Sequence, residues 1–574
     1  MSLRPNTKID ARRHGFKNLI NADEGRRRRE QDLVQIRRKR REQSLNKKRR
    51  IGVDARGVGN LLIILQAAVA GVYSDDVNEQ LQAITGLRKL VSSDNPPIRE
   101  VLQSGVVSRV VQLLGNNDSP TLQHEAAWVL TNIASGESEG AIAVIGHGAV
   151  PMFVRLLGSP HVTVRHQVVW ALGNIAGTSR ECRDVVLSNE ALGALLTQFT
   201  NDVELSMVKT ATWALSNFCK HKPKPSFELT KAGLPVLQQL VKFNDDEVQS
   251  EACWALSHLS DEIDESDGSS LAVIEAGFCP RLLKLLPHQS NDVVLPALLT
   301  VGNLIMINDH ANTQSMIDFG ALPPLVELLS NPRTDTITRE ACSVIMTIAA
   351  GTKELLEAVI QAGIVDPLVN LLEQAELDIR KEAAWAISNA TRIASNEQIR
   401  YESFLNPMLT SSSCRFLVHA GCIRPICSLL GCDDPFAIYS CLVALENILR
   451  AGEEEKKGIN VYAQMVSLAG GAEKVWNLQG NNDHDDIDEV AVEILELYFE
   501  ELMGAQQQAR PNEVLVEVEE GLAEAHRVPE FELIGCFRCL ECATSSLVLE
   551  LKCRYLSVDV HIRDEKYYVQ SWSL

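Results

Sequence analysis

The chain has 574 residues, which is enough for several globular domains or for one long repeat array. Charge is unevenly spread, because residues 1–50 carry a net +12 while the whole chain carries −20, which leaves −32 for the remainder. The fourteen cysteines are scattered through apolar stretches, which excludes a disulfide scaffold and indicates a reducing compartment.

Residues 1–55 are predicted to form a basic, flexible or helical arm without the apolar core of a secretory signal. Leu33, Ile36 and Leu45 interrupt the charges and indicate a helix that folds on a partner. A basic arm beside an acidic body can bind nucleic acid, bind an acidic partner or fold back on the body. We expect a protein partner and the body itself, and no nucleic acid.

The next segment, GVGNLLIILQAAVAGVYS at 57–74, is uncharged and just reaches membrane-spanning length. Asn60 and Gln66 interrupt it. We therefore expect the buried first helix of a soluble body rather than a membrane span.

A twelve-residue phrase then recurs along the chain, beginning with EAAWVLTNIASG at 125–136. Successive copies follow at steps of 42, 43, 41, 45, 44 and 42 residues. The paired positions, four residues apart, hold Trp128 and Asn132, Trp170 and Asn174, Trp213 and Asn217, Trp254 and His258, Leu299 and Asn303, Ser343 and Thr347, and Trp385 and Asn389. A later copy places Asn447 in the same register. Such a period is typical of a solenoid.

Each unit also carries a glycine, a proline and an apolar run, as in DFGALPPLVELLSN. The glycine is expected to end one helix and the proline to lie in the first turn of the next. Two or three helices per unit fit armadillo or HEAT architecture. The prediction is an all-α, right-handed armadillo-repeat solenoid of about ten repeats over residues 56–504.

Residues four apart share a helix face, so each Trp and Asn project together and the units align them in a row. A core role for each Trp is the alternative, which five recurrences in one register weaken. Parallel indoles leave slots in which Lys or Arg stems gain apolar and cation–π contact. An Asn amide satisfies the N–H and C=O of an extended peptide.

Acidic residues three positions before the Trp register favour cationic guests: Glu125, Glu251, Glu340 and Glu382. Each contact contributes about 0.5–2 kcal/mol, so several slots have to act together. The row is therefore predicted to bind short basic peptides in extended form.

Two segments do not fit the repeat. YESFLNPMLTSSSC at 401–414 is interpreted as a surface loop inserted between helices, with an unspliced piece of the gene as the alternative. Residues 505–574 are interpreted as a non-repeat, irregular tail. Its Cys536, Cys539 and Cys542 have no second paired ligand set, so no metal site and no cofactor are predicted.

The repeated phrases, together with DEGRRRREQDL at Asp23, resemble importin α, the family of nuclear import adaptors. The resemblance covers about residues 1–500, and MSLRPN and several repeat phrases resemble plant members most. It implies an adaptor that links cargo to importin β, shuttles between cytoplasm and nucleus, and is recycled by an export receptor. The receptor's binding region in the family matches the last repeat, near 486–502.

The resemblance also assigns roles to residues of this chain. Importin β is expected to bind Arg13, Arg26, Arg27, Arg28, Arg29, Arg37, Arg38, Lys39 and Arg40. An internal mimic of the nuclear localisation signal is expected at Lys48, Arg49 and Arg50, occupying the groove until importin β removes the arm. The major peptide site comprises Trp128, Asn132, Gly136, Gln167, Trp170, Asn174, Trp213, Asn217, Glu251 and Trp254, and the minor site comprises Asn303, Glu340, Glu382, Trp385 and Asn389.

The chain departs from the family pattern at several of these sites. Ala141 and Thr178 stand where the family has Thr and Asp, and losing a carboxylate opposite an ammonium costs about 1–3 kcal/mol. The other departures are His166 and Thr210 beside the major site and Leu299, Ser343 and Thr347 in the minor site. We expect weaker or altered signal binding.

Two other classes of protein compete with the adaptor. An armadillo scaffold for acidic or phosphorylated partners would need a basic groove, whereas this body is acidic. An enzyme would need a phosphate loop, a metal-ligand pattern or a nucleophile–base pair in a convincing context, and the sequence offers none. The sequence therefore predicts an adaptor and no enzyme.

Overall fold

The computed structural model describes residues 58–93, 95–136, 138–200, 202–261, 268–306, 310–392, 410–454, 460–479, 485–500, 558–563 and 566–571. The predicted basic arm at 1–55 lies outside the described residues, and so do its expected importin-β contacts, its internal signal mimic and the cysteines of the tail.

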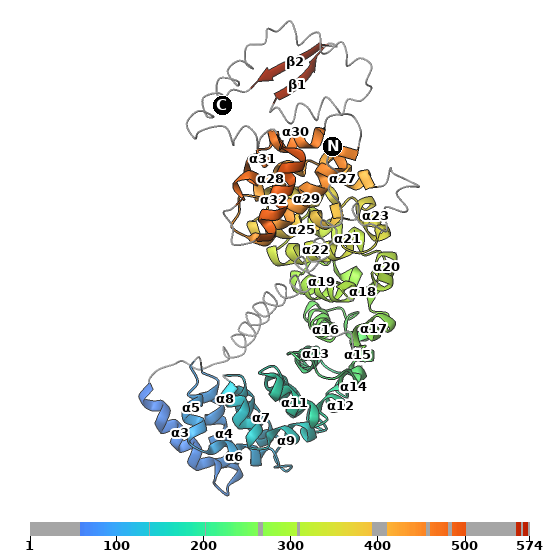
Figure 1. Cartoon of the computed structure of the whole chain (residues 1–574). Helices are drawn as coiled ribbons and strands as arrows, with labels where there is room; N and C mark the ends of the chain where they lie inside the picture. The colour runs from blue at the N-terminus through green and yellow to red at the C-terminus, as the bar shows by residue number, and fades with distance from the viewer. Residues whose placement is uncertain are drawn as a thin grey trace. The chain divides into compact units, whose positions relative to one another are not determined.

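The described body is built from helices that recur as two short ones and a long one (Figure 1). It begins with the pair α3 (Val58–Val72) and α4 (Val77–Val91), followed by α5 (Ile98–Gln103), α6 (Val106–Leu113), α7 (Pro120–Ala134), α8 (Ser138–Gly146), α9 (Ala149–Leu156), α10 (Val162–Ala176), α11 (Arg180–Ser188), α12 (Ala191–Leu196) and α13 (Leu205–Cys219). Next come α14 (Phe227–Thr230), the 3-10 turn η1 (Lys231–Gly233), α15 (Leu234–Leu240), α16 (Asp246–Leu259), α17 (Ser269–Glu275), α18 (Cys279–Leu285), α19 (Asn291–Met306), α20 (His310–Asp318), α21 (Leu322–Ser330) and α22 (Asp335–Ala349). The series ends with α23 (Lys353–Gln361), α24 (Val365–Gln374), α25 (Leu377–Arg392), α27 (Thr410–His419), α28 (Ile423–Leu429), α29 (Pro435–Glu454), α30 (Val461–Leu468), α31 (Gly471–Asn477) and α32 (Asp485–Tyr498).

The turn between the two short helices of most units is made by a glycine in the left-handed region, for example Gly320 at φ 88. Proline then lies in the first turn of the following helix, as in α18 and α21. This confirms the predicted glycine–proline punctuation. The unit of α11 and α12 is different, because Glu190 takes the glycine position with φ 60.

The long helices pack against one another in sequence, from α4 on α7 through α10, α13, α16, α19, α22 and α25 to α29. Leu130, Leu172, Leu215 and Leu256, one from each of four successive long helices, are at most 1% exposed. Each unit thus buries its apolar face against its neighbours. The predicted all-α solenoid is confirmed, and three helices per unit decide for armadillo rather than HEAT architecture.

The apolar segment at 57–74 forms α3, whose Leu65, Ala68 and Val72 are buried while Ile63 and Ile64 are exposed. No single helix in the described ranges is both long and apolar enough to cross a membrane. The pair α23 and α24 meets those limits only together, across a 77° bend.

The predicted loop at 401–414 is wrong at its C-terminal end. Helix α27 already begins at Thr410, and the Cys414 side chain is fully buried beside the carbonyl oxygen of Asn447 at 3.9 Å. Residues 401–409 lie outside the described residues. In the predicted tail, β1 (Val558–Arg563) pairs antiparallel with β2 (Lys566–Ser571), so this part of the tail is a hairpin rather than irregular.

Candidate functional site

The Trp register lies on the long helix of each unit. Trp128 on α7, Trp170 on α10 and Trp213 on α13 are half-buried, so part of each indole reaches the surface. Trp254 on α16 and Trp385 on α25 are only 4% and 6% exposed. Trp254 packs against Leu299, which occupies the Trp position of the next unit. The indoles therefore follow the packing order of the long helices.

The indoles of Trp170 and Trp213 are not parallel, contrary to the expectation for this pair. The ring centroids of Trp170 and Trp213 lie 6.5 Å apart at an interplanar angle of 64°, an edge-to-face contact. Carbon atoms in contact are about 3.5–4.0 Å apart, so a stem between two rings needs about 7–8 Å. An aliphatic stem at this pair therefore has to lie across the rings rather than between them.

Gly173 of α10 and Gly177, which directly follows α10, provide the space for the next unit's Trp and Asn. A Cβ at Gly173 would lie 2.4 Å from Cζ3 of Trp213, and a Cβ at Gly177 would lie 3.0 Å from Nδ2 of Asn217. Only a residue without a side chain leaves room at Gly173. Both glycines belong to the repeated phrase, and nothing in their local sequence indicates this role.

The asparagines hold neighbouring units in register. Nδ2 of Asn174 donates to the carbonyl oxygen of Thr131, and Nδ2 of Asn217 donates to that of Gly173, both at 3.1 Å. Asn303 and Asn389 donate in the same way to Ser257 and Met346 at 3.0 and 3.3 Å. An amide has two N–H donors and an acceptor oxygen. Asn174 and Asn217 thus each use one N–H donor for a hydrogen bond between units.

Helix α4 belongs to the same row, which the phrase search missed. Arg88 precedes Trp128 by one unit, and Ser92 precedes Asn132 by one unit. The guanidinium carbon of Arg88 lies 4.6 Å from the centroid of the Trp128 ring. Nδ2 of Asn132 donates to Oγ of Ser92 at 2.7 Å. A 40-residue step back from each position would have found this unit.

The acidic residues predicted beside the row have different environments. Glu125 accepts from Nε of Arg88 at 2.6 Å, so its carboxylate already has a cationic partner. Glu251 and Glu340 are 7% and 6% exposed, and Glu382 is half-buried. Gln167, expected in the major site, donates from Nε2 to Oγ1 of Thr131 at 2.9 Å and therefore also joins two units.

Two departures from the family pattern contact each other. His166 Nε2 lies 2.8 Å from Oγ1 of Thr210, while that hydroxyl donates to the carbonyl oxygen of Ser206 at 3.0 Å. The ring of His166 also lies 6.3 Å from that of Trp170. The substituted pair thus lines the row beside Trp170.

The other departures are accommodated locally. Ala141 is fully buried in α8. Thr178 donates from Oγ1 to the carbonyl oxygen of Asn174 at 2.9 Å, and Thr347 donates to that of Ser343 at 3.0 Å. Neither hydroxyl extends as far as a carboxylate or an amide would.

Helix α25 carries a group of buried polar atoms at the predicted minor site. Trp385 Nε1, Ser388 Oγ and Asn389 Oδ1 find no hydrogen-bond partner in the part of the chain that the structure describes. The three residues are 6%, 0% and 5% exposed. Buried polar groups are normally satisfied, so these three atoms are exceptions within the described part of the chain.

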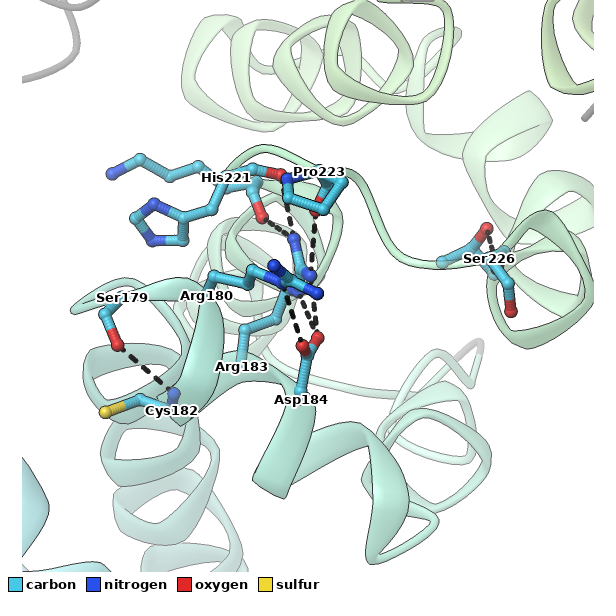
Figure 2. A network of polar contacts seen from close by, with 10 residues as sticks. Ser179, Arg180, Cys182, Arg183, Asp184, His221, Pro223 and Ser226 are labelled. Atoms are coloured by element: carbon cyan, nitrogen blue, oxygen red, sulfur yellow. Dashed lines mark hydrogen bonds and ion pairs between the residues drawn. The ribbon is translucent and has the colours of Figure 1, made fainter. Parts of the chain in front are cut away.

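A buried arginine supports the end of α13, the helix of Trp213 and Asn217. Arg183 on α11 is 1% exposed and donates to the carbonyl oxygens of Lys220, His221 and Pro223 at 2.6, 2.8 and 3.0 Å (Figure 2). Its charge is balanced by Asp184 at 2.7 Å. This cluster fixes the segment that follows the last turn of α13.

Nothing in the described ranges gathers three or more His, Cys, Asp or Glu side chains in a way that could hold a metal ion. The thiols of Cys219 and Cys253 are fully buried, and burial raises the pKa of each to about 12. Such thiols are protonated at neutral pH and do not act as nucleophiles.

Comparison with known protein families matches three models to the chain. The importin beta binding domain matches residues 12–85, and a HEAT-like repeat matches 187–259. The armadillo/beta-catenin-like repeat matches residues 94–135, 137–177, 266–306, 308–345 and 352–392.

Curated relatives share about half of the aligned residues. Importin subunit alpha-1a of Oryza sativa subsp. japonica is 51% identical, with 89% of this chain and 97% of the relative covered. Importin subunit alpha-3 of Arabidopsis thaliana is 48% identical, with 87% and 94% covered. Among solved structures, an engineered protein aligns with a TM-score of 0.65 and 27% identity, covering 75% of this chain and 98% of its own.

Proposed function

Because the chain belongs to the importin α family of nuclear import adaptors, we propose that its Trp and Asn row is the groove in which it binds lysine- and arginine-rich localisation signals. Importin β, bound through the N-terminal arm, then links the cargo to the transport machinery. The observation that carries this proposal is the unbroken register of half-exposed indoles and inter-unit amides from Trp128 to Asn217.

In the proposed major site an extended peptide runs across α7, α10 and α13. The second N–H and the oxygen of Asn174 and Asn217 pair with its backbone, which has no internal hydrogen bonds. Lysine stems lie across the faces of Trp170 and Trp213, where methylene contact and cation–π attraction add about 0.5–2 kcal/mol per side chain. Of the acidic register, Glu125 is already paired with Arg88, and Glu251 on the adjoining α16 is the next carboxylate along the row.

In the proposed minor site the unsatisfied polar atoms of α25 form hydrogen bonds with the backbone of a bound peptide. Asn389 Oδ1 accepts a hydrogen bond from a guest backbone N–H, and Trp385 Nε1 donates to a guest carbonyl. Ser343 and Thr347 on the neighbouring α22 supply neither an indole nor an amide. The minor site therefore binds a second basic cluster of the peptide through fewer contacts than the major site provides.

The basic arm is proposed to compete with cargo through Lys48, Arg49 and Arg50, whose charges match those of a signal peptide. Importin β removes the arm from the groove, which couples cargo loading to carrier binding. The last repeat is proposed to contact an export receptor, so that the protein shuttles between cytoplasm and nucleus. We assign it no catalytic step, no cofactor, no nucleic-acid partner and no membrane partner.

Peptide binding to the full chain and to a version lacking residues 1–50, each with and without importin β, tests this proposal. The full chain should bind a lysine-rich peptide weakly, and either deletion of the arm or addition of importin β should raise the affinity. If deletion changes nothing, residues 48–50 do not compete for the groove. If neither form binds the peptide, the groove assignment is wrong.

A further inference from the structure

The row of indoles ends at an arginine of the chain itself. Arg88 occupies the Trp register one unit before Trp128, and its guanidinium lies over the Trp128 ring at 4.6 Å. Nε of Arg88 also pairs with Glu125 at 2.6 Å, with side-chain exposures of 18% and 13%. The arrangement repeats the contact of a cation with an indole face that is proposed above for the lysines of a bound peptide, and adds a carboxylate to it.

Other contacts hold Trp128 in place around this arginine. His124, one turn earlier on α7, meets the indole edge to face at 5.6 Å. Nδ1 of His124 lies 3.2 Å from the carbonyl oxygen of Thr163, so the ring is anchored to α10. Arg88 therefore covers the face of the Trp128 indole that points toward α4, and the contact with His124 fixes the orientation of that indole.

We propose that Arg88 is a built-in guest that fills the outermost slot of the row, so that no peptide side chain binds beyond Trp128. This inference rests on the proposed function, because it assigns a boundary to the same groove. It makes Arg88 the residue that limits how many lysines of an extended peptide the groove recognises. The guanidinium suits this position because it stacks flat on an indole while its N–H groups pair with a carboxylate.

Substituting Arg88 should lengthen the recognised peptide. Successive side chains of an extended chain point to opposite sides, so one additional slot engages the lysine two residues farther along. With glycine-flanked peptides of four to nine lysines, the affinity of the unaltered chain should stop rising at a certain length. In R88A that length should increase by two residues, with a further gain of roughly 3- to 30-fold from one cation–π contact beside Glu125.

Three variants of the full chain, measured with excess importin β, make the test specific. R88M removes the charge but keeps an apolar stem over Trp128, so it should keep the original length limit. R109A removes an arginine that stacks on Tyr73 at 5.7 Å outside the row, and should also keep it. Circular dichroism confirms that each variant is folded.

The outcomes separate this inference from the proposed function. A shift of the limit in R88A alone supports the built-in guest. An unchanged length limit in R88A overturns the inference, because no further slot then lies beneath the arginine. An equal shift in R88M also overturns it, because the charge of Arg88 alone, and not its side chain over Trp128, then closes the slot. If the unaltered chain binds none of these peptides, the proposed function itself fails, and the inference fails with it.

Discussion

Gly173 offers the sharpest test of how the groove is assembled. A Cβ at this position would lie 2.4, 2.9 and 3.1 Å from three carbons of the Trp213 ring. Ordinary carbon contacts begin near 3.5 Å, so in G173A the ring edge has to move by about 1 Å. Overpacking of this kind costs about 1–3 kcal/mol, which the better helix propensity of alanine offsets by about 1 kcal/mol.

The expected result is a lower denaturation midpoint and a two- to fivefold weaker affinity for a lysine-rich peptide, which corresponds to about 0.5–1 kcal/mol for one weakened aromatic contact. Urea denaturation and fluorescence anisotropy measure the two quantities. Gly86 on α4 is the matched control, because a Cβ there meets nothing within 4 Å. G86A should gain about 0.5–1 kcal/mol without changing affinity. If G173A raises the urea midpoint and keeps the peptide affinity as G86A does, the position of Trp213 does not depend on the missing side chain at residue 173.

Replacing the exposed Glu190 by glycine should stabilise the protein by about 1 kcal/mol, because its φ of 60 is costly for a residue with a side chain; an unchanged urea midpoint would count against this strain. R183M should destabilise by about 3–5 kcal/mol, because it removes the hydrogen bonds that the buried guanidinium donates to three main-chain carbonyl oxygens. R180M removes only the exposed 3.5 Å pair with Asp184 and should change stability by less than about 1 kcal/mol. Similar losses in both variants would contradict the buried role of Arg183. In alkylation at pH 8 followed by mass spectrometry, the half-buried Cys432 should react well before Cys219. The pKa of Cys219 is about 12, so roughly one in ten thousand of its side chains is a thiolate at that pH. The opposite order of reaction would refute the raised pKa.

The period and the punctuation of the solenoid could be predicted from the sequence because they are local. A glycine required by a left-handed turn and a proline in the next first turn leave their marks within a few residues. The Trp register recurs at a nearly constant step, so its place on the long helices followed from the period alone.

Contacts between units could not be predicted from the sequence, because they join residues about 40 positions apart. Gly173 resembles any glycine within a helix, and its importance appears only when Trp213 of the next unit lies against it. The angle between Trp170 and Trp213 depends on the packing of two helices, so the expectation of parallel rings was wrong. Arg183 has no sequence signal, since its partners are main-chain carbonyls 37 to 40 residues away.

The unit with Arg88 was missed for a different reason. Arg88 and Ser92 keep the spacing of the register, but neither residue is a Trp or an Asn. The repeat period, and not the residue type, marks this unit. The loop prediction at 401–414 failed because an unmatched segment was taken to be unstructured, whereas its end continues into α27.

The central claim is that the exposed indoles of the row hold the basic peptide, and two variants test it most directly. W170A/W213A removes the edge-to-face pair of the major site, while W476A removes a half-buried indole of α31, outside the row. Affinity for a lysine-rich peptide, measured with importin β present, should fall at least tenfold in W170A/W213A and stay unchanged in W476A. Equal affinities in the two variants would contradict the account.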